Sequence, residues 1–296
     1  MIDRNLVILA GGISSRMKKP AAGPLDERLL SDAQEKVKTM IGVGRERRPL
    51  LDYLLYNAQQ AGYRDIVVVV SGFDRSVREH YGPADSGNSY HGLSISYAVQ
   101  SIPPGRTKPL GTANALLRAL YARPDWEGKK FTVCNSDNLY SARALALLLE
   151  TDADAAMIDY DREALQCDAD RVRQFAVLKE DGEGRLEEII EKPSPEQVAR
   201  VREAGGRVGV SMNIFRFLYD RILPFLESVP LHPARLEKEL PVAVMLMIGE
   251  HPGSMIAIPL AEHVPDLTSR DDIHRVREYL EREYPDDLWT QKNRLH

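Results

Sequence analysis

The chain has 296 residues, and its 39 basic and 44 acidic residues leave a net charge of −5 at pH 7. This length allows one large α/β domain or two small ones, because domains typically contain about 100–200 residues. The acidic balance and the lack of a long Lys/Arg block argue against nucleic acid as a partner. No apolar stretch approaches the ~20 residues that span a bilayer, which argues against a membrane partner.

The two cysteines, Cys134 and Cys167, form no CxxC pair and have no histidines at metal-ligand spacing. This pattern argues against a disulfide scaffold and a structural zinc site, and it fits a reducing compartment. The first residues lead directly into a predicted strand and contain no apolar signal-peptide region. We therefore expect a cytoplasmic protein.

The first half of the chain alternates apolar, strand-like runs with helical patterns. Apolar runs without a polar break are typical of strands that are buried on both faces of a parallel sheet. The expected strands are residues 6–10, 66–70, 93–99 and 131–134, and the expected helices are residues 49–61 and 112–122. This alternation predicts an α/β fold with a doubly wound, predominantly parallel sheet.

The second half is more mixed, with a turn expected at the sequence EDGEGR between two strands. The expected strands are residues 155–160, 175–179, 186–190, 212–217 and 255–259, and the expected helices are residues 219–226, 236–248 and 270–283. One long irregular stretch, residues 18–34, is rich in Pro, Gly and charge. We interpret it either as a mobile loop or lid beside the first strand or as an inert surface insertion.

The sequence LVILAGGISSRM places Gly11 and Gly12 directly after the first strand. Ligands of open α/β sheets bind at the carboxyl ends of strands, where glycine lets the backbone approach a phosphate closely. Arg16 adds a planar, permanently charged group that suits phosphate oxygens. Lys38 is a second candidate cation, with a solvated surface lysine as the alternative. Neither GxxxxGK[ST] nor GxGxxG occurs, which argues against an ordinary P-loop or dinucleotide site.

Two aspartates are candidate metal ligands. Asp137 follows the buried strand of FTVCNSDNLYS, and a carboxylate at such a strand end can hold Mg²⁺, which takes one or two carboxylates plus substrate phosphates. Turn formation is its alternative role. Asp266 follows the strand at residues 255–259, so it can lie at the same edge of the sheet as a second ligand. Its alternative is to cap the last helix, a role that Ser269 could take instead.

Together these segments resemble the sugar-1-phosphate nucleotidyltransferases, also called NDP-sugar pyrophosphorylases. LAGGISSRM is similar to their N-terminal pattern LAGGxxxRM/L, and KTMIGVGRERRPLLDY resembles their lysine motif K-x-L-L-P-V-x-x-x-P-L-I. LGTANAL, NSDNLY, EKP, VSMNIFRF and PDLTSRDDI follow in the order of the family's remaining motifs. The resemblance covers residues 6–283 and implies a Rossmann-like nucleotidyltransferase fold of the glycosyltransferase-A type.

The resemblance implies a role for each matching residue. Arg16 and Lys38 would hold the triphosphate, Lys192 would bind the phosphate of the sugar, and these three would be the catalytic cations. Asp137 and Asp266 would hold Mg²⁺, the one implied cofactor. Gln100 and Gly111 would contact the base, with Glu191 and Asn213 near the sugar ring. The implied substrate-binding residues are Ala10, Gly11, Gly12, Arg16, Lys38, Gln100, Gly111, Thr112, Asn138, Glu191, Lys192 and Asn213.

The chain also departs from the family pattern. Gly42 stands where the lysine motif has proline, and Ser211 and Asn213 replace the usual Asn and Gly. The gaps between Arg16 and Lys38 and between Gln100 and Gly111 are longer than usual. These differences lie in the parts of the chain that would form the two substrate sites.

The implied reaction joins an NTP and a sugar 1-phosphate to give an NDP-sugar and pyrophosphate, with Gln100 favouring uridylyl or thymidylyl transfer. The alternatives are a nucleotidyltransferase with a non-sugar acceptor, such as a molybdopterin or a small alcohol phosphate, and a catalytically silent nucleotide-binding regulator. We expect one catalytic domain over residues 1–296, with a nucleotide half at about 1–150 and a sugar-phosphate half at about 151–296. The expected partners are the two small-molecule substrates, and the resemblance also allows a homo-oligomer.

Overall fold

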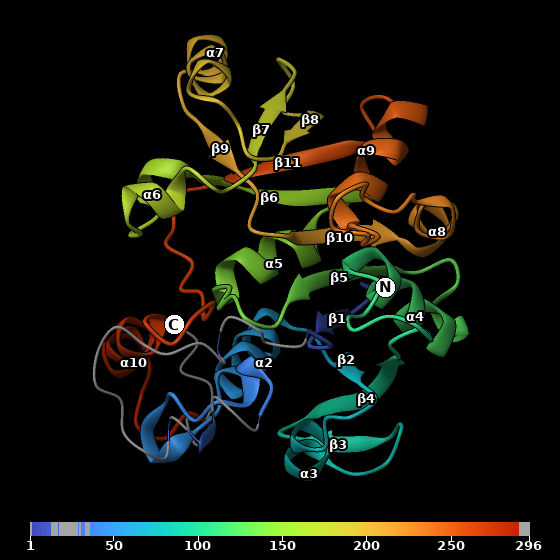
Figure 1. Ribbon diagram of the computed structural model, residues 1–296, viewed down its shortest axis with the longest axis vertical. Coiled ribbons are helices and arrows are strands. Elements are labelled where there is room, and N and C mark those ends of the chain that lie inside the picture. Colours follow the sequence, from blue (N-terminus) through green and yellow to red (C-terminus); the bar gives the residue numbers. More distant parts are fainter. Residues whose placement is uncertain (1, 13–16, 18–28, 30, 33–35, 290–296) are drawn as a thin grey trace.

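The computed structural model describes residues 2–12, 17, 29, 31–32 and 36–289, which include one mixed sheet of eleven strands (Figure 1). The strands are β1 (Asn5–Leu9), β2 (Asp65–Ser71), β3 (Asn88–Tyr90), β4 (Leu93–Gln100), β5 (Lys130–Asn135), β6 (Ala155–Asp161), β7 (Val177–Glu180), β8 (Leu186–Ile190), β9 (Gly209–Val210), β10 (Ile214–Leu218) and β11 (Met255–Leu260).

The centre of the sheet consists of parallel strands in the order β4, β2, β1, β5. Leu6 of β1 lies opposite Ile66 of β2 and Thr132 of β5, so the carboxyl ends of these strands meet at one edge. β10 runs antiparallel to β5, with Ile214 opposite Cys134, and therefore begins at that same edge. The edge thus collects the residues that follow the parallel strands and those that precede β10.

Helices cover both faces of the sheet. α2 (Leu50–Ala61), α5 (Ala142–Glu150) and α10 (Asp272–Glu283) pack on one face, and α4 (Thr112–Ala122), α8 (Tyr219–Ser228) and α9 (Leu240–Glu250) pack on the other (Figure 1). Further helices among the described residues are α3 (Ser76–Tyr81), α6 (Ala169–Val172), α7 (Pro195–Gly205) and the short 3-10 turns Lys38–Met40, Arg45–Arg47, Pro124–Trp126 and Arg162–Ala164.

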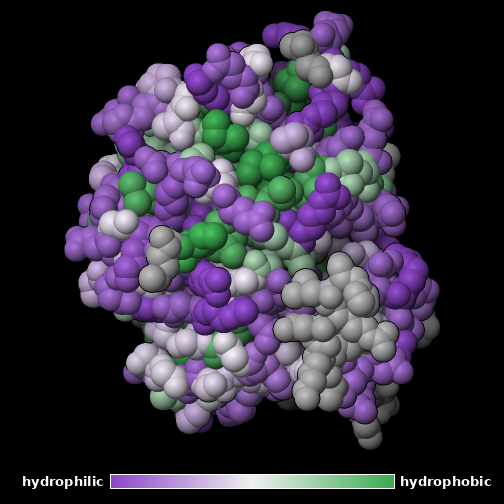
Figure 2. Space-filling model, turned by 180° about the vertical axis from the view of Figure 1, so that it is seen from behind, coloured by the Kyte–Doolittle hydropathy of each residue, from purple (hydrophilic) through white to green (hydrophobic). Residues whose placement is uncertain are grey.

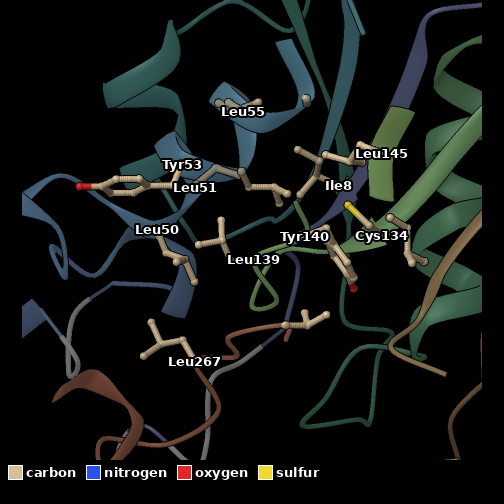
Figure 3. Close-up of a cluster of buried hydrophobic side chains, with 14 of the residues drawn as sticks. Ile8, Leu50, Leu51, Tyr53, Leu55, Cys134, Leu139, Tyr140, Leu145 and Leu267 are labelled. Carbon is tan, nitrogen blue, oxygen red and sulfur yellow. The ribbon is translucent and has the colours of Figure 1, made fainter. Parts of the chain in front are cut away.

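Successive residues of the central strand enter different cores. Leu6 and Ile8 of β1 pack under α2 and α5, whereas Val7 packs under α4. Figure 3 shows the first of these cores, where Ile8 lies beside Leu145 of α5 and near Leu51 of α2. The predicted burial of this strand on both faces is confirmed, and with it the doubly wound α/β fold.

Beyond β10 the sheet continues through β6, β9, β7 and β8, and β11 pairs with β6 in parallel. β7 and β8 form the predicted hairpin at EDGEGR. The carboxylate of Asp181 closes its turn by accepting hydrogen bonds from the backbone N–H groups of Glu183 and Arg185, at 2.8 and 2.9 Å. Gly184 takes a φ of 74°, a conformation that favours glycine.

The ends of some predicted elements are wrong. The helix expected from residue 236 begins at Leu240, because Pro241 occupies its first turn and the residues before it form a loop. The last helix begins at Asp272, and Ser269 does not cap it: the backbone N–H and hydroxyl of Ser269 both donate to the carboxylate of Asp272. The sequence analysis does not anticipate α3, α5 or α7.

The surface is largely polar. In the view of Figure 2, hydrophilic residues dominate, and hydrophobic ones gather in the upper half of that face. The most apolar helix, α9, has only 11 residues. No helix among residues 36–289 or the other described residues is long and apolar enough to cross a membrane.

One buried hydroxyl ties the sheet to its covering layer. The hydroxyl of Tyr63, which has no exposed surface, lies 2.6 Å from Oγ1 of Thr132 in β5 and donates to the carbonyl of Leu145 in α5 at 3.1 Å. Because a lost buried hydrogen bond typically costs about 1–2 kcal/mol, we expect Tyr63→Phe to lower the free energy of unfolding by that amount in guanidinium denaturation.

Tyr121 provides the matched control, since its ring is 51% exposed and its hydroxyl donates to Glu227 at the surface. Tyr121→Phe should change the free energy of unfolding by less than ~0.5 kcal/mol. Equal losses in the two variants would show that burial of the Tyr63 hydroxyl adds nothing to stability.

Candidate functional site

A pocket of about 510 Å³ opens at the carboxyl edge of the parallel strands. Its described walls come from the turns after β1, β4 and β5, the start of α4, residues 37–39 and residues 235–241. The predicted site residues that line it are Ala10, Gly11, Gly12, Lys38, Gln100, Gly111, Thr112, Asp137, Glu191 and Asn213.

The side chain of Gln100 has a fixed orientation at the end of β4. Its Nε2 donates to the carbonyl of Gly111 at 2.8 Å and to Oδ1 of Asn114 at 3.2 Å. Both N–H groups are therefore engaged, and Oε1 is left facing Gly11, where an added Cβ would lie 3.0 Å from it. Glycine at position 11 thus makes room for the acceptor oxygen of Gln100.

Lys38 and Asp137 form an ion pair within the pocket. Nζ of Lys38 lies 2.5 Å from Oδ2 of Asp137, and both side chains remain partly accessible. The Asp137 turn is anchored on two sides, because Ser136 N donates to the Leu9 carbonyl at 3.2 Å and Leu267 N donates to the Asp137 carbonyl at 2.8 Å. This places a cation suited to phosphate and a carboxylate suited to a metal next to each other.

Backbone hydrogen bonds join the start of α4 to the loop before α9. Lys238 N donates to the Leu110 carbonyl at 2.5 Å, and Ala113 N donates to the Lys238 carbonyl at 3.0 Å. Oγ1 of Thr112 accepts from the N–H of Leu240 at 2.9 Å. Gly111 has a φ of 99°, and an added Cβ there would lie 2.6 Å from the Lys238 carbonyl oxygen. These contacts fix one wall of the pocket.

The same loop contributes charged side chains to the pocket. Arg235 pairs with Glu239 through two contacts of 2.7 Å, which gives a two-pronged ion pair. Protein around the carboxyl group of Glu191, and secondly the negative charge of Glu239, raise the pKa of Glu191 above its usual range. Acidic groups are therefore crowded on this side of the pocket.

Two predicted sugar-side residues have strained backbones. Lys192 and Asn213 take φ values of 48° and 56°, in the left-handed region where residues other than glycine are uncommon. Strain of this kind is often found at ligand sites, and asparagine tolerates it better than most residues. Asn213 lines the pocket, whereas Lys192, which follows Glu191 directly, is not among its lining residues.

Two further predicted residues, Asn138 and Asp266, are not among the described lining residues of the pocket. The buried amide of Asn138 donates to the Met212 carbonyl and to the Tyr140 hydroxyl, at 3.1 and 3.0 Å. These hydrogen bonds stabilise the turn that contains Asp137. The Asp266 carboxylate lines a separate cavity, where it contacts Arg171. Arg16 lies outside the described residues, as does most of the stretch 18–34.

A divalent cation fits the pocket at Asp137. The described lining includes three basic side chains, Lys38, Lys108 and Arg235, against four carboxylates, so a polyanionic ligand needs further positive charge there. Within the described part of the chain, no three His, Cys, Asp or Glu side chains are grouped to hold a metal. A single carboxylate nevertheless suits Mg²⁺, which keeps several waters and binds substrate phosphates.

The sequence analysis misses part of the pocket lining. Lys108, Arg235, Glu237 and Glu239 lie in loops without hydrophobic periodicity, so no regular pattern marks them. Only Pro241 gives a usable signal, because proline in a first helical turn indicates that the preceding residues are outside the helix.

Comparisons with known proteins bear on the family and the fold of the chain. The family model described as nucleotidyl transferase matches residues 6–217, more than half of the chain. The chloroplastic/amyloplastic glucose-1-phosphate adenylyltransferase small subunit of Triticum aestivum is 27% identical over 199 residues, which cover 65% of this chain and 38% of that protein. The chain therefore matches well under half the length of this curated relative.

A similar solved structure is described as a glucose-1-phosphate thymidylyltransferase from Bacillus anthracis in complex with a sucrose. It superimposes with a TM-score of 0.67 at 18% identity and covers 96% of this chain and 98% of that one. At this identity the likeness concerns the fold, and it confirms the predicted Rossmann-like α/β architecture.

The wall at Gly111 can be tested by substitution. We expect Gly111→Ala to lower the free energy of unfolding by at least ~3 kcal/mol, because it combines an unfavourable φ with a collision against the Lys238 carbonyl. Gly105→Ala is the control: φ there is 78°, and nothing lies within 4 Å of the added Cβ, so the loss should be about 1 kcal/mol. Equal losses in denaturant unfolding would contradict the role given to this contact.

Proposed function

Since the chain belongs to the nucleotidyl transferase family, we propose that it joins an NTP to a sugar 1-phosphate, forming an NDP-sugar and releasing pyrophosphate. The names of the wheat relative and of the Bacillus anthracis protein both refer to glucose 1-phosphate, which supports a sugar 1-phosphate as the acceptor.

The observation that carries this proposal is convergence in one pocket. Gly11, Lys38, Gln100, Asp137 and Glu191 are spread over 180 residues of sequence, yet all line the same cavity at the carboxyl edge of the sheet. Backbone amides beside glycine, a lysine and a carboxylate suit a triphosphate with its metal. The same lining offers Glu191 and Asn213 to a second, hydroxyl-bearing ligand.

The chemistry requires little from a general base. A phosphate oxygen of the sugar 1-phosphate is already ionised near neutral pH, and it forms a bond to the α-phosphorus while the bond to the departing pyrophosphate breaks. Repulsion between two anions and in-line alignment therefore limit the rate, and positioned cations supply most of the catalysis. We assign this role to Lys38, Arg16 and Lys192.

Lys38 would exchange one anionic partner for another. Without substrate its ammonium pairs with Asp137, at 2.5 Å. An incoming triphosphate would take the ammonium, and the Asp137 carboxylate would then be available to a cation. Mg²⁺, the proposed cofactor, would neutralise phosphate charge, with Asp137 as one carboxylate ligand and Asp266 proposed as the second.

Gln100 supports a base with an N–H group on its recognition edge, because Gln100 lines the pocket, both of its own N–H groups are engaged, and its acceptor Oε1 lies beside Gly11. Uracil and thymine carry such a donor at N3, next to two carbonyl acceptors that can meet backbone N–H groups near Gly111. We therefore propose uridylyl or thymidylyl transfer.

We further propose a nucleotide half at about residues 1–150 and a sugar-phosphate half at about residues 151–296, within one domain. Gly11 and Gln100 come from the first half, and Glu191 and Asn213 come from the second.

Free Cys134 and Cys167 support a cytoplasmic location. The proposed homo-oligomer can be tested by size-exclusion chromatography.

A pyrophosphate-release assay tests the proposed function. With Mg²⁺, we expect release only when an NTP and a hexose 1-phosphate are both present, in a screen of four or five NTPs against common sugar 1-phosphates. Release with other phosphorylated acceptors alone would instead support a non-sugar substrate. Nucleotide binding without turnover across the whole screen would support the silent regulator.

Asp137→Asn tests the metal ligand, since it keeps the side-chain size and removes the charge. We expect kcat to fall by at least about a hundredfold, because a positioned metal charge contributes several kcal/mol to such transition states. Asp152→Asn, at an exposed carboxylate outside the pocket, should keep full activity. Full activity in the Asp137 variant would remove the metal assignment.

A further inference from the structure

A second cavity of about 40 Å³ adjoins the segment that pairs with the Asp137 turn. Asp266 lines this second cavity and is not among the described lining residues of the main pocket. Its described lining is Gln166, Cys167, Arg171, His263, Pro265, Asp266, Asp272, Arg275 and Val276.

The backbones of the two aspartates are nevertheless neighbours. Asn138 and Asp266 form a β-bridge, and hydrogen bonds of 2.8 Å run from Leu267 N to the Asp137 carbonyl and from Leu139 N to the Pro265 carbonyl. The carboxylates of Asp137 and Asp266 are therefore separated by the direction of their side chains and not by the path of the chain. A change of the Asp266 rotamer would move its carboxylate without moving the backbone.

Arg171 of α6 holds the Asp266 carboxylate in the second cavity. Its guanidinium forks between Asp266 and Asp272, contacting both carboxylates. Oδ2 of Asp266 also accepts from the hydroxyl of Thr268 at 2.8 Å. Only 9% of the Asp266 side chain and 20% of the Arg171 side chain are exposed, so water screens this ion pair weakly.

Arg171 keeps a partner even when Asp266 leaves. Asp272, with 2% of its side chain exposed, contacts Arg171 separately and also accepts from Arg275 at 2.7 Å. The backbone N–H groups of Thr268 and Ser269 donate to the same carboxylate, at 3.0 and 2.7 Å. Although burial disfavours the charged form of Asp272, the hydrogen bond from Arg171, and then those from Ser269 N and Arg275, lower its pKa. Asp272 is thus a permanent anchor for Arg171.

The other titratable groups facing this cavity do not compete for Asp266. Burial, and then the charges of Arg275, Arg282 and Arg171, lower the pKa of His263 to about 4, so its ring is neutral at pH 7. Burial raises the pKa of the Cys167 thiol, which stays protonated. Arg171 is accordingly the cation that contacts Asp266 in the described part of the chain.

We propose that Arg171 is a latch on Asp266, which keeps this carboxylate away from Asp137 until a divalent cation replaces the guanidinium as its partner. The inference rests on the proposed function, because it gives Asp266 its use as the second metal ligand. Arg171 is then a positioning residue that sets the metal affinity of the site. The two carboxylates meet only in the metal-loaded state, which keeps two like charges apart when no metal is bound.

Direct binding of Mn²⁺ to the full chain, followed by the electron paramagnetic resonance signal of the free ion, tests the latch. We expect Arg171→Gln to bind Mn²⁺ about five- to tenfold more tightly than the unaltered protein, because the competing cation is gone. Arg171→Lys keeps the positive charge but loses the guanidinium that contacts both carboxylates, so we expect a smaller increase in Mn²⁺ affinity. Near-UV circular dichroism confirms that each variant is folded.

Two further variants show where the gain arises. In an Asp266→Asn background, Arg171→Gln should give no gain, since the carboxylate that it releases is absent. Arg275→Gln removes a cation of the same cluster that contacts Asp272 and Asp168 but not Asp266, so it should change the affinity by less than about twofold. Unchanged or weaker Mn²⁺ binding in Arg171→Gln, or a gain that persists with Asp266→Asn, would overturn the proposal. Mn²⁺ binding and circular dichroism are both measured without turnover. A failure of the latch can therefore be told apart from a failure of nucleotidyl transfer.

Discussion

The parallel pairing of β1 between β2 and β5 is the constraint on which the rest of the structure depends. It brings the carboxyl ends of the central strands to one level and, through the antiparallel start of β10, adds Asn213 to the same edge. Residues that are far apart in the sequence therefore line one cavity. Burial of β1 on both faces holds this arrangement in place, because a slip by one residue would exchange Val7 with Leu6 and Ile8 between the two cores.

Under the proposed function the pocket accepts two anions, although its own described lining is rich in carboxylates. Charges are paired internally, Lys38 with Asp137 and Arg235 with Glu239 in the pocket, and Arg171 with Asp266 in the second cavity. Each pair prevents an isolated charge in a partly dry site, where it would be costly. Under the proposed function, a ligand replaces the member of the pair that has the same sign of charge, so the protein already contains the charges that the substrates need.

Much of the fold could be predicted from the sequence, because apolar runs such as residues 66–70 and glycines after a strand have direct physical meanings. The same signals located Gly11 and Asp137, since both follow buried strands. Arg235, Glu239 and Arg171 could not be found in this way, because side chains in loops and in the four-residue helix α6 carry no periodicity. Ser141 and Ser194 cap the N-termini of α5 and α7. Such N-cap residues are a sequence signal for a helix, but a search for hydrophobic periodicity alone does not detect them. The position of the Asp266 side chain depends on a partner about a hundred residues away, and no local pattern encodes it.

The β7–β8 hairpin has a practical use that follows from its geometry. Gly182 at its tip has open space around it, with nothing within 4 Å of an added Cβ. β8 runs from that tip directly to Glu191, and five residues of strand span roughly 17 Å. A fluorophore attached at the tip would therefore be connected through β8 to Glu191, which lines the pocket. Such a label could report ligand arrival in real time without occupying any of the space that the ligands require.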